Sequence, residues 1–449
     1  MNKLKNKSQM IIIVSSFLII LISLIALVIV KSYAIYKLEK EYDVIKSVIG
    51  DFRGSVVNYK YYIDDIEVTD MPSKDQYKYV SNSCDNANGS FDANDWSFKI
   101  SDATTRVVNC SITFTKINNL YELIKSQSLG LDTVVGLDYD KISSDSNGKG
   151  VYSTTNTDFG KEVYFYRGDV NNNNVLFGGF CWKIVRTTET GGVKLIYNGK
   201  ADNQCLSIEN NNTYISKGHY NETTGDNANV GYMYGNLNAS NYEDTHKNIN
   251  NSTIKNIVDY WYENNLINYS SYIEDSVYCN DRSTIKYDAT KILNFANYSD
   301  LGYGTTSTLY AASARGWSNS KKTNPTLKCI NKNDKFTVSS DIGNGNLTYP
   351  IATITIDEIL YAGLNAGYAI KQQEAINTNF YLYNNITYWT MTPIASRSNY
   401  TGIARMRNDG HTDYNATNQY YAIRPVITLK NNTKITGKGT QEEPYTIEY

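Results

Sequence analysis

The feature that most constrains how this chain can fold is an uninterrupted apolar run near its N-terminus. Residues 10–30 read MIIIVSSFLIILISLIALVIV and contain no charged side chain. A helix of this length can cross a hydrocarbon core of about 30 Å. The run predicts a transmembrane signal anchor, which makes residues 1–9 a cytoplasmic N-terminus and places the rest of the chain beyond the other face of the membrane.

The cysteines support this orientation, because the lysines on the two flanks of the run nearly balance and decide little by themselves. All six cysteines follow the apolar run, and an even number favours three disulfides in an oxidising space. We therefore expect a single-pass protein of the cell membrane whose C-terminal part is extracellular. A cleaved signal peptide and a pilin-type N-terminus are the alternatives, although the run is long for the first and lacks the early Glu of the second.

Charge and composition exclude several classes of protein. Lys and Arg number 43 against 45 Asp and Glu, which argues against a nucleic-acid partner because that requires a basic excess. Only 6 Pro and 29 Gly argue against a disordered chain. The 40 Tyr favour strands and exposed ligand-binding faces, although a compositionally biased genome would produce them too.

Residues 31–50 are expected to form a stalk, and residues 51–117 a small β-sandwich-like domain. Its clearest strand places Val108, Cys110, Ile112 and Phe114 on one face, because side chains alternate along a strand. Cys84 is the natural partner of Cys110 across so small a core, and such a disulfide should contribute about 3 kcal/mol.

Residues 118–150 are expected to be a linker with a short helix at Leu120–Ile124, followed by a large domain over residues 151–449. Three strands joined by two tight turns are predicted between residues 163 and 197, and an Asn-rich loop between 200 and 250. Helices are predicted at 251–266 and after the capping box Thr355-x-x-Glu358. Cys181 can then pair with Cys205, which leaves Cys279 with Cys329.

Several stretches together resemble a family of uncharacterised bacterial membrane-anchored surface proteins. They are Phe180–Arg186 (FCWKIVR), Cys279–Ser283 (CNDRS), Gly345–Pro350 (GNLTYP), Tyr388–Pro393 (YWTMTP) and Ile423–Ile427 (IRPVI). The C-terminal part of that family is similar to the C-type-lectin-like fold of formylglycine-generating enzymes. The resemblance implies an α+β fold class, with a C-type-lectin-like α+β domain after the anchor and the small domain, and a displayed binding fold without catalysis.

Catalysis and metal binding find little support in the residues. The only histidines, His219, His246 and His411, have no metal-ligand spacing, and His411 is expected at the surface because it follows a turn. The segment from Asp169 to Asn174 lacks the Gly and Glu of a calcium loop and is predicted to be a hairpin turn. The cysteine pair of formylglycine-generating enzymes lies late in their fold, whereas this chain has no cysteine after Cys329. We expect no enzyme activity, no cofactor and no metal.

The segment 396–420 is the predicted recognition face. It mixes Tyr and Arg with Asn and Asp, which is the composition of many binding surfaces. The candidate ligand-binding residues are Arg397, Tyr400, Arg405, Arg407, His411, Tyr414 and Tyr420. A solvated turn region is the competing interpretation.

The sequence thus predicts a non-enzymatic surface protein that recognises a protein or glycan ligand through a lectin-like domain. A structural or assembly protein of the cell envelope, pilin-like in its anchorage and self-associating, is the alternative, and an envelope enzyme is the weakest one.

Overall fold

The computed structural model describes residues 56–449 except 75, 202, 207–211, 289–294, 317–323 and 366–374. The chain divides into two compact units, Met1–Lys116 and Ile117–Tyr449, which are described separately. The predicted N-terminus 1–9, membrane anchor 10–30 and stalk 31–50 lie outside the described residues. Within the described ranges, no helix combines the length and the apolar character that a membrane span requires.

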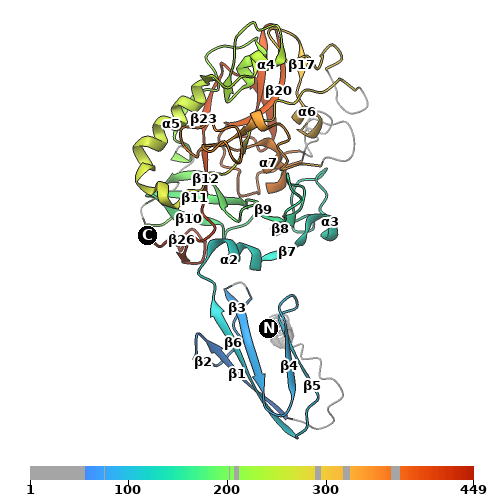
Figure 1. Cartoon of the computed structure of the whole chain (residues 1–449), viewed down its shortest axis with the longest axis vertical. Coiled ribbons are helices and arrows are strands. Elements are labelled where there is room, and N and C mark those ends of the chain that lie inside the picture. The colour runs from blue at the N-terminus through green and yellow to red at the C-terminus, as the bar shows by residue number, and fades with distance from the viewer. Residues whose placement is uncertain are drawn as a thin grey trace, which may run out of the picture. The chain divides into compact units, whose positions relative to one another are not determined.

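The first unit consists of one sheet and one hairpin (Figure 1). In the sheet, β1 (Val56–Ile63) runs parallel to β6 (Val107–Lys116), and β2 (Ile66–Val68) and β3 (Tyr77–Cys84) complete the order β2-β1-β6-β3. The hairpin is formed by β4 (Asn88–Asp92) and β5 (Ser97–Ser101), and its Phe91 ring contacts those of Tyr79 and Phe114. Aromatic packing therefore joins the hairpin to the sheet.

The core of the first unit is small, as the sequence indicates. Val108, Cys110, Ile112 and Phe114 of β6 are buried, and the residues between them are more exposed. Cys84 lies directly opposite Cys110 in the β3–β6 ladder, and the two form a disulfide. The pairing therefore follows from the strand register.

The second unit is built on two sheets. The larger one has the order β19-β24-β12-β11-β10-β26-β25, and β9 attaches β8 and β7 to β11. The smaller one has the order β13-β23-β20-β21-β22, with β17 on β20. The strands of the larger sheet are β7 (Ser128–Leu131), β8 (Gly150–Thr154), β9 (Val163–Arg167), β10 (Asn174–Phe177), β11 (Phe180–Thr187), β12 (Val193–Lys200), β19 (Ala352–Thr353), β24 (Pro425–Leu429), β25 (Ile435–Thr436) and β26 (Tyr445–Ile447). Those of the smaller sheet are β13 (Ser216–His219), β17 (Thr308–Leu309), β20 (Tyr388–Arg397), β21 (Tyr400–Met406), β22 (Thr412–Ala416) and β23 (Tyr420–Ile423).

Short elements complete this unit. Two ladders of two strands each pair β14 (Met233–Tyr234) with β15 (Asn250–Asn251) and β16 (Tyr278–Cys279) with β18 (Lys335–Phe336). The described helices are α2 (Leu120–Ser126), α3 (Asp132–Val135), α4 (Tyr242–Thr245), α5 (Thr253–Asn265), α6 (Ala312–Gly316) and α7 (Ile356–Ala362), with 3-10 turns η2 (Asn227–Val230), η3 (Ile267–Tyr272) and η4 (Lys332–Asp334).

The helices predicted from sequence form where expected. Ser252 caps α5, whose Ile254, Val258 and Tyr262 are buried, and Figure 1 shows this helix along the side of the unit. Thr355 and Glu358 form the capping box of α7, which ends before Gly363. Leu120 and Ile124 of α2 are buried in the main core, so the segment expected as a linker belongs to the second unit.

The predicted α+β fold class is wrong, because strands account for 36% of the structure against 15% for helices and are arranged in several sheets. Only α5 exceeds seven residues among the described helices. The physical reason lies in composition: Tyr, Thr, Val and Ile lose rotamer freedom in a helix but pack well on a pleated surface. Short strands in polar stretches also escaped prediction, because these stretches show no alternation of apolar and polar residues.

The predicted three strands between 163 and 197 are four. Gly178 and Gly179, with φ of 61° and 80°, form a tight turn that splits one expected strand into β10 and β11. Two consecutive left-handed residues give the turn that suits a two-residue hairpin, and glycine adopts that conformation without strain. The disulfide Cys181–Cys205 joins β11 to the segment after β12, as predicted.

Candidate functional site

The predicted recognition face lies on β20, β21, β22 and β23, but Arg405, Arg407 and His411 pair with carboxylates of the same segment. Arg405 Nη2 donates to Asp413 Oδ2 at 2.8 Å, and Arg407 Nη1 donates to the same oxygen at 3.1 Å. His411 Nδ1 lies 2.7 Å from Asp409 Oδ1. These side chains hold neighbouring strands together, which leaves less of their hydrogen-bonding capacity for a ligand.

The expectation that His411 is exposed is wrong, since only 2% of its surface is accessible. Gly410, with φ of 93°, turns the chain, and the His411 carbonyl accepts a hydrogen bond from Arg407 N. Burial lowers the pKa of His411, with Asp409 opposing that change.

The other predicted residues form two separate groups. The Arg397 guanidinium lies 5.6 Å from the ring centre of Tyr400, which packs on Tyr414 at 5.9 Å. Tyr420 lies apart from them, 60% exposed and beside His219. Ligand binding by these residues stays a prediction.

Substitution of Tyr400 tests whether its ring packs in the structure rather than serving only to bind a ligand. We expect Tyr400→Ala to lower the free energy of unfolding by about 2 kcal/mol, because the ring is half-buried against Tyr414. Tyr420→Ala is the matched control and should cost less than about 0.5 kcal/mol, because that ring is exposed. Urea unfolding measures both, and equal costs for the two variants would contradict a packing role for Tyr400.

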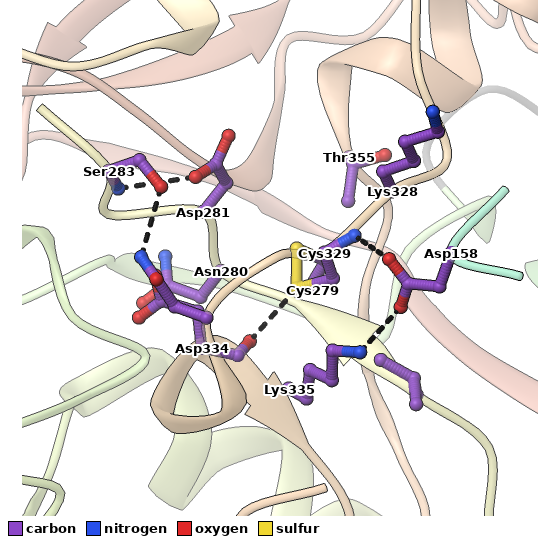
Figure 2. Close-up of a disulfide and its surroundings, with 12 residues drawn as sticks. Asp158, Cys279, Asn280, Asp281, Ser283, Lys328, Cys329, Asp334, Lys335 and Thr355 are labelled. Atoms are coloured by element: carbon purple, nitrogen blue, oxygen red, sulfur yellow. Dashed lines mark hydrogen bonds and ion pairs between the residues drawn. A yellow bond between two sulfur atoms is a disulfide. The ribbon is translucent and has the colours of Figure 1, made fainter. Parts of the chain in front are cut away.

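A charged cavity of about 240 Å³ offers a better site. It lies where the ends of β11 and β12, the first turn of α7, and residues 274–281 and 326–329 meet. The disulfide Cys279–Cys329 joins two of these segments, which are 50 residues apart in sequence (Figure 2). This covalent link fixes part of the wall.

Glu358 at the start of α7 is the most buried carboxylate of the cavity. Its Oε1 accepts hydrogen bonds from Arg186 Nε at 2.9 Å and Lys194 Nζ at 3.0 Å, and all three side chains are at most 8% exposed. Its Oε2 accepts from the backbone N of Thr355 at 3.0 Å, which closes the helix cap. The two cations lower the pKa of Glu358 to about 2 even though burial acts in the opposite direction.

The pKa of Lys194 is also lowered, but for a lysine this disfavours the charged form. Burial, and then repulsion from Arg186, lowers its pKa to about 8, while Glu358 opposes both effects. Its ammonium group also donates to the carbonyl of Val277 at 3.3 Å and lies 5.0 Å from the ring centre of Tyr278. Near neutral pH the group is charged, so one carboxylate faces two cations.

Other residues that line the cavity form further ion pairs. Arg315 donates to Asp357 at 2.9 Å and to Asp281 at 2.9 Å. Figure 2 shows Asp158 between the backbone N of Cys329 and the Lys335 ammonium, each at 2.7 Å. These contacts link segments that are distant in sequence around the disulfide.

Sequence reasoning missed this cavity, although one signal was present. Arg186 and Lys194 are basic residues in strands rich in apolar residues, and such residues are rarely buried without a partner. The partner itself could not be identified, because Glu358 lies more than 160 residues away in sequence. In the part of the chain that the structure describes, no group of three or more His, Cys, Asp or Glu could hold a metal ion.

Comparison of this chain with protein-family models, with curated proteins and with solved structures gave no match.

Proposed function

We propose that this chain is a membrane-anchored extracellular protein that binds a small polar ligand in the cavity beside the Cys279–Cys329 disulfide. The observation that carries the proposal is the cavity itself, a concave site of about 240 Å³ with both charged and apolar walls. Concave sites with a few placed polar groups are where small molecules bind.

The arrangement of the walls supports recognition. The charged side chains are held in place by ion pairs and by the disulfide before any ligand arrives. Such preorganisation lowers the entropy that binding must overcome. We propose binding rather than catalysis because the central charged groups are held in fixed ion pairs, with Glu358, the most buried acid, ionised between Arg186 and Lys194.

The proposed location rests on two features. The apolar run 10–30 has the length and composition of a membrane anchor. The three disulfides join all six cysteines, which fits a compartment outside the membrane because cytosolic thiols are kept reduced.

A binding panel tests the proposal. The full chain, produced in an oxidising compartment and purified in detergent, is probed with saccharides, amino acids and peptides, with and without a chelator. We expect selective binding, weakened at least about tenfold by Thr190→Trp, because Thr190 lies at the exposed edge of the cavity and the larger ring narrows it.

The matched control is Asn264→Trp, on an exposed position of α5, which should bind as the unaltered chain does. Equal binding by the Thr190→Trp variant would place the ligand elsewhere and contradict the proposed site. Absence of any binding, together with ordered self-association in light scattering, would favour the envelope-assembly role instead.

A further inference from the structure

The Glu358 end of the cavity has an unbalanced positive charge. Arg186 and Lys194 are both cationic, and the single carboxylate of Glu358 is the only acid within ion-pair distance of either one in the described chain. Arg186 donates through Nε to Glu358 and through Nη1 to the Thr187 carbonyl, and its Nη2 has no acceptor among the described residues. Both N–H groups of Nη2 are therefore free, and the ion-paired group of two cations and one carboxylate carries a net positive charge.

Glu189 is the next carboxylate near these cations. It lies on the turn after β11 and acts on both of them through longer-range attraction, but it forms no ion pair with either. It therefore reduces the excess positive charge without occupying the free donor of Arg186.

Glu274, at another part of the cavity, is a carboxylate without a cation partner among the described residues. The Oε1 atom of Glu274 accepts hydrogen bonds from the hydroxyls of Thr188 and Thr190, while its Oε2 has no donor among the described residues. No cation of the described chain lies within ion-pair distance of this carboxylate, and burial raises its pKa. Asp275, the next residue in the chain, accepts from the backbone N of Val338 and Ser339, and its charge also raises the pKa of Glu274.

The connection between β11 and β12 brings the two charged ends near each other. Glu274 Oε2 packs against Gly192, where an added β-carbon would come within 2.4 Å of it. Lys194 is two residues further along the chain, on β12. It lies directly opposite Arg186 of β11 in the strand ladder. Gly192 directly precedes β12, so the short connection between β11 and β12 brings Glu274 close to the two cations.

We propose that the cavity binds a small zwitterion, an amino acid or a close derivative, with its carboxylate at Arg186 and Lys194 and its ammonium group at Glu274. The inference rests on the proposed function and specifies its ligand class. A carboxylate accepts from the free Nη2 donor and balances the excess cation, and an ammonium group donates to the free oxygen of Glu274. A ligand with only one of the two charges satisfies only one end.

Modified ligands test each end of the zwitterion separately. The full chain in detergent is titrated calorimetrically with L- and D-forms of alanine, leucine, glutamate and lysine, and with the amide and the N-acetyl derivative of each. At least one free amino acid should bind, and its amide and N-acetyl derivatives should each bind at least about tenfold more weakly, because each loses a charge-assisted hydrogen bond. Equal binding of either derivative would overturn the proposal.

Two conservative variants assign the ends to residues. Arg186→Lys keeps the charge but removes the free donor, and Glu274→Gln keeps an oxygen acceptor but removes the charge. Each should weaken binding of the free amino acid about tenfold or more, and Glu274→Gln should leave binding of the N-acetyl derivative unchanged. Glu443→Gln, which removes a carboxylate from an exposed ion pair with Lys438, is the matched control and should have no effect.

The outcomes separate this proposal from the broader one. Binding of a saccharide or peptide that Thr190→Trp weakens, without binding of any amino acid, would overturn the zwitterion and leave the cavity as the recognition site. Amino-acid binding that neither conservative variant changes would overturn the residue assignment. No binding of any probe would remove support from both proposals.

Discussion

Glu358→Gln is expected to lower the free energy of unfolding by about 3–5 kcal/mol, because it leaves Arg186 and Lys194 buried without a charged partner. The change isolates the charge. Gln keeps the size of Glu and can still accept the backbone hydrogen bond from Thr355 that caps α7. Urea unfolding at pH 7 measures the loss.

The same residue makes a pH-dependent contribution whose sign can be derived. The pKa of Glu358 falls from an ordinary 4.5 to about 2 on folding, so its stabilisation is complete above 4.5 and is lost as pH falls toward 2. A shift of this size corresponds to about 3 kcal/mol. The unaltered chain should therefore lose more stability than the Glu358→Gln variant between pH 4.5 and 2.

The control for this prediction is Glu443→Gln. Its ion pair with Lys438 is more than half exposed on both sides, and such pairs contribute little, so the cost should stay below about 1 kcal/mol. A cost for Glu358→Gln as small as that of the control would show that Arg186 and Lys194 find other compensation, and would contradict the interpretation of the cavity.

Joint replacement of Cys84 and Cys110 by Ser should unfold the first unit selectively. The disulfide closes a loop with a sequence separation of 26 residues, which corresponds to about 3 kcal/mol in the chain-entropy model. The unit has only a few fully buried apolar side chains, and domains of this size have little stability to spare. Loss of the cross-link is therefore expected to exceed the stability that the core provides.

Limited proteolysis with mass spectrometry measures this effect. Cleavage should appear within residues 56–116 of the variant, while residues of the second unit stay protected, because that unit has its own core and two disulfides. Joint replacement of Cys181 and Cys205 is the control and should leave the first unit protected. Equal protection of residues 56–116 with and without the Cys84–Cys110 bond would contradict a stabilising role.

Local signals were sufficient for the elements that they predicted correctly. The alternation from Val108 to Phe114 predicted the buried face of β6. The spacing of Ile254, Val258 and Tyr262 predicted the buried face of α5. The capping box at Thr355 and Glu358 set the start of α7. All three disulfides were predicted because the cysteines of each pair flank neighbouring predicted elements or remained after the others were assigned.

The fold class and the site were predicted less well. Many strands are two to five residues long and lie in polar sequence, so they form through pairing with distant partners rather than through their own periodicity. Arg405, Arg407 and His411 had the composition of a recognition surface, but the structure supplies Asp409 and Asp413 as their partners. Composition reports which groups are present and cannot report which of them are already paired.

The amino-acid sequence by itself determined the apolar run, the even set of cysteines, the principal helices and the buried face of β6, because each depends on residues that are close along the chain. Only the tertiary structure decided that the chain is mostly β and that Glu358 meets Arg186 and Lys194. Those contacts join segments more than 160 residues apart. Their formation depends on the sum of all packing and pairing energies in the unit, and no local pattern in the sequence records that sum.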